Sequence, residues 1–291
     1  MKRFSKRLNR AIRLLCLVAC VVVMKYYSAC HSPGKDDTAI EMPKSVERTA
    51  VNQPQPAMPA EITATIPSPL MAAKVDGEII LKREGYTCSY NPLTRQPNYV
   101  SWALTPQRLE GNAKRTAFSE DPDLGETEQS KLDDYKFSGY SRGHMCPAAD
   151  NKWSVRAMNE TFLLSNICPQ TQTLNGGDWE ELESACRQWT QSSGVTLYIV
   201  CGPVFEGTHH RKLHKRVPVP EKFFKAVVCT QKGQQRGIAF VYNNNAESHS
   251  MSYYVCTIDS VERLTGFDLF HTIPQKIQNR IEATANLNQW Q

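Results

Sequence analysis

Residues 139–150 of the chain read GYSRGHMCPAAD. Within them Arg142 and His144 stand on either side of one glycine. An arginine binds phosphate through its planar guanidinium group, and a histidine can accept a proton from water near neutral pH. This short pattern also fits a surface loop with unrelated charges, so its interpretation depends on the sequence that follows.

Two further blocks lie downstream, at residues 160–170 (ETFLLSNICPQ) and 174–187 (LNGGDWEELESACR). Together the three blocks give Arg-Gly-His, then Asn-x-x-Pro-Gln, then Asn-x-x-x-Trp-x-x-x-Glu. In this ordered series the chain closely resembles the DNA/RNA non-specific endonuclease family of the ββα-metal superfamily, which includes endonuclease G. The resemblance runs from about residue 99 to residue 270. It implies an α+β, ββα-metal (His-Me finger) fold with a central, mainly antiparallel sheet flanked by helices.

The resemblance also implies a role for each matching residue. His144 matches the family's general base, and Asn175 matches its direct protein ligand for Mg²⁺. Glu183 matches the acid that holds the metal through water. Three more residues match two phosphate-binding arginines and an auxiliary site asparagine: Arg142, Arg187 and Asn166.

The chemistry of these residue types agrees with the resemblance. Mg²⁺ keeps several of its waters in proteins, so one amide oxygen from Asn175 is enough to place it. Glu183 lies about one and a half turns into a helix expected over residues 178–191, and Arg187 follows one turn later on the same face. We therefore predict a Mg²⁺-dependent endonuclease, with Mn²⁺ as a substitute ion. It would hydrolyse both DNA and RNA and leave 5′-phosphate ends.

One position departs from the family pattern. The Asp that usually precedes Arg-Gly-His is Ser141 here, and a serine offers hydrogen bonds but no charge. Ser141 therefore leaves one alternative open, a surface nucleic-acid-binding protein with weakened catalysis. An enzyme acting on a different phosphodiester is a second alternative, because the substrate class comes from the resemblance alone. The basic run at residues 209–216 (HHRKLHKR) fits a solvated loop best, then a surface that follows a nucleic-acid backbone, and least of all a separate metal site.

The N-terminal segment is typical of an export signal. Residues 1–30 hold seven Lys and Arg and no acid, and include a short apolar run at 14–24. That run is far shorter than the ~20 residues of a membrane-spanning helix. Small residues precede Cys20 and Cys30, as at the lipidated cysteine of bacterial lipoproteins. We expect export to the cell envelope, periplasm or outer surface, with membrane contact only through this lipid or signal anchor.

The composition defines the rest of the chain. Residues 31–75 are rich in proline and read as a disordered spacer, which leaves residues 76–291 as the nuclease domain. Beyond the first thirty residues the chain holds 27 basic and 29 acidic residues, a net charge of −2. This balance excludes a global basic field, so any anion binding must be local. Seven scattered cysteines in an exported domain predict disulfides plus a leftover thiol, and the sequence leaves the oligomeric state unknown.

Hydrophobic patterning predicts a sheet with intervening helices. A capping-box pattern at Asp259 and Glu262 marks the start of one helix. Trp179 and Trp189 share an apolar helix stripe and are expected in the core. The expected strands span residues 99–104, 195–200 (ended by Gly202-Pro203), 224–229, 238–242 and 251–258. The other expected helices span residues 178–191 and 274–285.

Overall fold

The computed structural model describes residues 70–290 of the 291-residue chain. The export segment, Cys20, Cys30 and nearly all of the expected spacer lie outside the described residues. Within residues 70–290, no helix is long and apolar enough to cross a membrane. Residues 70–75, expected in the spacer, instead pack on the folded body, where Ala72 is buried and the Ala73 amide donates to the Asp268 carbonyl at 2.8 Å.

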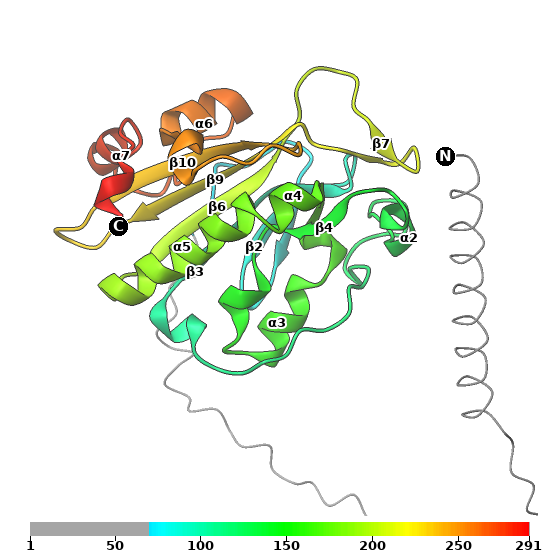
Figure 1. The fold of residues 1–291 in the computed structure, drawn as a ribbon, viewed down its shortest axis with the longest axis horizontal. Helices are drawn as coiled ribbons and strands as arrows, with labels where there is room; N and C mark the ends of the chain where they lie inside the picture. Colours follow the sequence, from blue (N-terminus) through cyan, green and yellow to red (C-terminus); the bar gives the residue numbers. More distant parts are fainter. Residues whose placement is uncertain (1–69, 291) are drawn as a thin grey trace, which may run out of the picture. The chain divides into compact units, whose positions relative to one another are not determined.

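A seven-stranded antiparallel sheet forms the centre of the fold (Figure 1). Its strand order is β1-β2-β3-β6-β9-β10-β11. The strands are β1 (Ile79–Lys82), β2 (Thr87–Asn91), β3 (Gln96–Leu104), β6 (Leu197–Val204), β9 (Lys222–Cys229), β10 (Arg236–Asn243) and β11 (Val255–Cys256). Neighbouring strands pair antiparallel throughout, so the predicted mainly antiparallel sheet is confirmed.

Helices cover both faces of this sheet (Figure 1). Side chains alternate between the faces along a strand, and in β9 Phe223 and Val227 face one cluster while Phe224 and Val228 face the other. The first cluster includes the apolar stripe of α5 (Asp178–Ser193), with the two expected core tryptophans. The second packs under α6 (Ile258–Thr265) and α7 (Gln275–Ile281).

A separate two-stranded unit carries the first two sequence blocks. Strand β4 (Ser141–His144) pairs antiparallel with β5 (Ile167–Gln170), and α4 (Gln172–Asn175) and α5 follow directly. This is the ββα arrangement that the resemblance implied. Shorter elements connect the rest: η1 (Pro106–Leu109), α2 (Leu132–Tyr135), η2 (Ala148–Asn151), α3 (Val155–Thr161), η3 (Leu164–Asn166), β7 (Lys212–Leu213), β8 (Val217–Pro218), η4 (Met251–Tyr254) and η5 (Leu287–Gln289).

Three element predictions were wrong in detail. Strand β6 does not end at Gly202-Pro203 as predicted but continues to Val204, paired with β9. Its pairing with β3 ends at Cys201, so the missing N–H of Pro203 removes no bond to β3. Residues 251–258 form η4, a two-residue strand and the start of α6, because the Tyr254 hydroxyl donates to Asp178 and anchors a turn there. Helix α6 is capped two residues before the predicted cap at Asp259. The capping group is the Thr257 hydroxyl, which accepts from the Ser260 amide at 3.2 Å.

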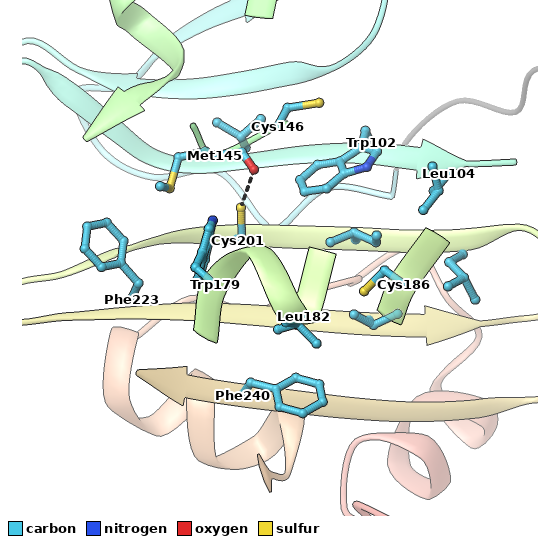
Figure 2. Packing of buried hydrophobic residues seen from close by; sticks show 14 of the residues in the cluster. Trp102, Leu104, Met145, Cys146, Trp179, Leu182, Cys186, Cys201, Phe223 and Phe240 are labelled. Atoms are coloured by element: carbon cyan, nitrogen blue, oxygen red, sulfur yellow. Dashed lines mark hydrogen bonds between the residues drawn. The ribbon is translucent and has the colours of Figure 1, made fainter. Parts of the chain in front are cut away.

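The prediction of disulfides is also wrong for the described residues. All seven cysteines between residues 70 and 290 are free thiols, and six of them are buried. They act as small apolar packing residues. Figure 2 shows Cys186 of α5 and Cys201 of β6 in this core, where the Cys201 thiol donates to the Met145 carbonyl at 3.3 Å.

Candidate active site

A cavity of about 190 Å³ lies where β4 meets the beginning of α5. Its walls include four of the residues predicted from the sequence, drawn from β4, α4 and α5. These four are His144, Asn175, Glu183 and Arg187. Chain segments about thirty residues apart therefore bring a base, an amide, a carboxylate and a guanidinium to one place.

His144 ends β4 and presents an imidazole without a partner. Its Nε2 atom is buried and makes no hydrogen bond within the described chain. Phe118 and Phe162 pack against the ring at centroid distances of 5.3 and 5.0 Å, and the Trp179 indole donates to the His144 carbonyl at 3.2 Å. Burial, and secondly the charge of Arg115, lower the pKa of His144 to about 3. The ring is therefore neutral at neutral pH, which is the form that accepts a proton.

Gly143, the residue before His144, is a glycine for a steric reason. A Cβ atom at Gly143 would collide with the side chain of Gln170 on the paired strand β5. Gln170 is fully buried, so it has no space to move away. The Arg-Gly-His and Pro-Gln motifs are thus two halves of one close strand contact.

Asn175 and Glu183 form the part of the cavity that suits a cation. Asn175 is half-buried at the end of α4, and Glu183 enters from α5 with a side chain that is 12% exposed. Burial raises the pKa of Glu183 to about 7, while Lys225 opposes the rise. A desolvated carboxylate that shares a cavity with an amide oxygen matches the all-oxygen preference of Mg²⁺ or Mn²⁺. The residues present therefore fit a hydrated divalent ion.

The two predicted arginines lie in adjoining places. Arg187 lines the cavity, where the buried Asp150 carboxylate holds its guanidinium at 3.1 Å. Asp150 also accepts from the Trp102 indole at 3.0 Å, so the carboxylate is fixed from two sides. Arg142 instead lines the groove that continues from the cavity, with its guanidinium 5.2 Å from the Phe118 ring centroid.

Asn166 does not line the cavity. It is fully buried, and its carboxamide accepts from the Cys146 amide and donates to the Cys146 and Thr161 carbonyls, each at 2.9 Å. It therefore positions the chain that follows His144. Ser141 is half-buried at the start of β4, opposite Gln170 in register, and lines the groove beside Arg142.

Sequence reasoning missed three site residues. Arg115 lines both the cavity and the groove, yet it stands in a stretch without any motif. Asp150 lies at the end of the first quoted block, where its role was not recognised. Lys225 lies under Glu183, with its ammonium 3.6 Å from the carboxylate, and a lysine within the apolar strand run FFKAVVC could have signalled it.

Comparison with known proteins places this geometry in a family. The profile described as DNA/RNA non-specific endonuclease matches residues 66–276. The chain belongs to the DNA/RNA non-specific endonuclease family. This membership makes it a nucleic-acid hydrolase, and enzymes of the endonuclease G type are metal-dependent.

Individual relatives agree with the family assignment. Human mitochondrial endonuclease G is 34% identical over 199 residues, which cover 63% of this chain and 67% of that protein. The mitochondrial Nuclease 1 of Schizosaccharomyces pombe is 31% identical over 246 residues, which cover 77% of this chain and 74% of that protein. A crystal structure of the EndoG/EndoGI complex matches with a TM-score of 0.63 at 26% identity, covering 71% of this chain and 89% of that one.

Proposed function

We propose that this chain is a Mg²⁺-dependent, sugar-non-specific endonuclease that cleaves both DNA and RNA to 5′-phosphate and 3′-hydroxyl ends. The observation that carries the proposal is the convergence of the unpartnered His144 imidazole and the Asn175 carboxamide on one cavity with Glu183 and Arg187. Base, metal ligand and phosphate-binding group are the parts that phosphodiester hydrolysis needs.

His144 would act as the general base. A water molecule attacks the phosphorus, its proton passes to the imidazole, and the bond from phosphorus to the 3′ oxygen breaks. The 3′ oxygen leaves with the bonding electrons and takes up a proton from solvent to become the 3′-hydroxyl. The negative phosphate beside the ring opposes the effect of Arg115 and so makes the imidazole more basic than it is in the empty cavity. Phe118 and Phe162 hold the ring in place for this transfer.

Three arginines would bind the substrate. Arg187 is fixed by Asp150 in the cavity itself, whereas Arg115 and Arg142 extend the positive charge into the groove. Guanidinium groups bind phosphate oxygens without reading the bases or testing for a 2′-hydroxyl. Binding would therefore depend on the phosphates and not on the base sequence or the sugar. Affinity for nucleic acid should fall as the salt concentration rises.

Asn175 would hold the divalent ion directly and Glu183 would hold it through water. When bound, the ion supplies Lewis-acid stabilisation of the charge that develops on the phosphate and on the leaving oxygen. The contribution of the chain is to bring the amide, the carboxylate and the imidazole to the lining of one cavity.

Digestion of supercoiled plasmid and of single-stranded RNA, with Mg²⁺, Mn²⁺ or EDTA, tests the proposal. We expect both substrates to be cut with either ion and neither with EDTA. Asn175→Ala should raise the Mg²⁺ concentration needed for half-maximal rate, whereas His271→Ala, an exposed histidine beside Met71, should behave as wild type. Binding of DNA without cleavage in every metal would favour the weakened nucleic-acid-binding alternative, and cleavage in EDTA would exclude the metal role.

A further inference from the structure

Phe137 is the most exposed large apolar side chain of the described residues. It lies in the turn between α2 and β4, and it is 96% exposed. Its φ angle is +54°, in the left-handed region that L-residues with side chains rarely occupy. A phenylalanine therefore takes up an unfavourable backbone conformation without burying its ring. Such a combination often marks a position kept for function rather than for stability.

The turn that carries Phe137 is firmly held on both sides. The Tyr135 hydroxyl donates to the Ile167 carbonyl at 3.3 Å, and the Ser138 hydroxyl donates to the Tyr135 carbonyl at 2.8 Å. His214, from the loop after β7, lies with its Nε2 atom 3.1 Å from the Lys136 carbonyl. Figure 1 shows α2, β4 and β7 gathered at one end of the molecule. The exposed ring is thus displayed on a fixed support.

This ring lines the groove that begins at the candidate active site. The groove has a volume of about 500 Å³, and His144 and Asn175 line both this groove and the cavity. Its other lining residues include three cations and two further exposed or half-buried aromatic rings: Arg115, Lys136, Arg142, Phe118 and Tyr140. Arg211 does not line the groove, but its guanidinium lies over the Tyr140 ring, 5.1 Å from the ring centroid.

The groove therefore combines positive charges with aromatic rings, and Lys136 and Arg142 each lie over one of those rings. A ligand that matches it carries both negative charges and flat faces, which is the chemistry of a nucleic-acid strand. A purely apolar partner would leave the cations without partners, and a simple polyanion would leave the Phe137 ring in water. The ammonium of Lys136, 5.7 Å from the Phe137 ring centroid, places a phosphate-binding charge directly beside the ring.

We propose that Phe137 is a stacking platform for an unpaired nucleobase of the strand whose phosphate enters the cavity at His144. This inference rests on the proposed function, since it assigns a further contact to the same substrate. A base can lie on an exposed ring only when it has left its own stack. The contact therefore favours single-stranded or locally opened substrate over intact duplex, without preference for a particular base.

Binding of oligonucleotides in EDTA, where no metal supports turnover, tests the platform. The probe is a single-stranded DNA decamer that carries 2-aminopurine, whose fluorescence falls on stacking. Phe137→Ala should weaken binding by about 5- to 150-fold. This is the range expected when alanine replaces an aromatic side chain on which a base stacks. Phe137→Trp should keep the affinity, and Leu93→Ala, an 86% exposed residue that does not line the groove, should not change it.

Two further arms separate stacking from a structural role. Phe137→Gly should raise the midpoint of thermal unfolding, because glycine adopts a positive φ freely, while it loses affinity as Phe137→Ala does. A decamer with abasic sites should bind wild type and Phe137→Ala equally. Equal affinity of wild type and Phe137→Ala for the 2-aminopurine decamer would overturn the stacking role. Absence of metal-dependent cleavage by wild type would count against the proposed function alone, since this binding comparison needs no turnover.

Discussion

Lys225 allows a quantitative test of how the site is supported. Its side chain is 1% exposed in the middle of β9, with the ammonium 3.6 Å from the Glu183 carboxylate and 4.1 Å from the Trp179 ring centroid. Two charges at this separation attract by about 5 kcal/mol at an effective dielectric constant of about 20. The ring contact adds about 1–2 kcal/mol. Lys225→Met keeps the apolar stem but removes both interactions.

We expect Lys225→Met to lower the free energy of unfolding by about 3 kcal/mol, because it leaves the Glu183 carboxylate buried without its closest cation. In a folded unit of this size that loss lowers the midpoint of thermal unfolding by about 6–12 °C. The assay is urea unfolding of wild type, Lys225→Met, Glu183→Gln and the double variant in EDTA. Adding the losses of the two single variants gives an expected free energy of unfolding for the double variant. The measured value should exceed it by about 2 kcal/mol.

Lys222→Met on the same strand is the matched control. Lys222 pairs at the surface with Glu206, and both side chains reach solvent, so the substitution should change stability by less than about 0.5 kcal/mol. A coupling between Lys225 and Glu183 below about 0.5 kcal/mol, or equal effects of the two lysine substitutions, would refute the view that Lys225 supports Glu183 electrostatically.

Two more predictions follow from the buried carboxylates. Asp150→Asn should lower kcat/KM about 10- to 100-fold, because the Arg187 guanidinium loses the charge that orients it, while cleavage by a matched Asp259→Asn variant is unchanged. Glu282 lies in a cluster whose carboxylate oxygens, with those of Asp259 and Glu262, are within 4.8 Å of one another. Burial first, and then Glu262, raise the pKa of Glu282 to about 7, so the folded state binds this proton more tightly than the unfolded state does. The stability that this group contributes is therefore complete below about pH 4.5 and is lost as pH rises to 7. Glu282→Gln should raise the free energy of unfolding by about 1 kcal/mol at pH 8, after allowance for solvent screening, and should have little effect at pH 4; an equal gain at both pH values would contradict this sign.

The fold was predictable where local pattern and tertiary structure agree. The alternation at residues 99–104 and the helical stripe that includes Trp179 both arise from one face or one stripe meeting a core. The prediction failed at residues 251–258, where the apolar pattern suggested a strand. There hydrogen bonds to Asp178, far away in the sequence, hold Tyr254 and the residues before it in a turn.

The site residues likewise fall into those that the sequence predicts and those that it does not. His144, Asn175, Glu183 and Arg187 were predictable because ordered motifs carry them. Arg115 was not, because no spacing connects it with the cavity. The disulfide prediction failed because cysteine count alone does not distinguish a thiol that pairs from one that packs in a core.

The most direct test of the account is a double-mutant cycle between His144 and Asn175 on kcat/KM for a single-stranded DNA substrate in saturating Mg²⁺. Each alanine variant should lose about 10²–10⁴-fold in rate at unchanged thermal stability. Because the two residues act on one phosphate, the double variant should be much less impaired than the product of the single losses. Wild-type rates in His144→Ala, or strictly multiplicative losses, would contradict a single shared site.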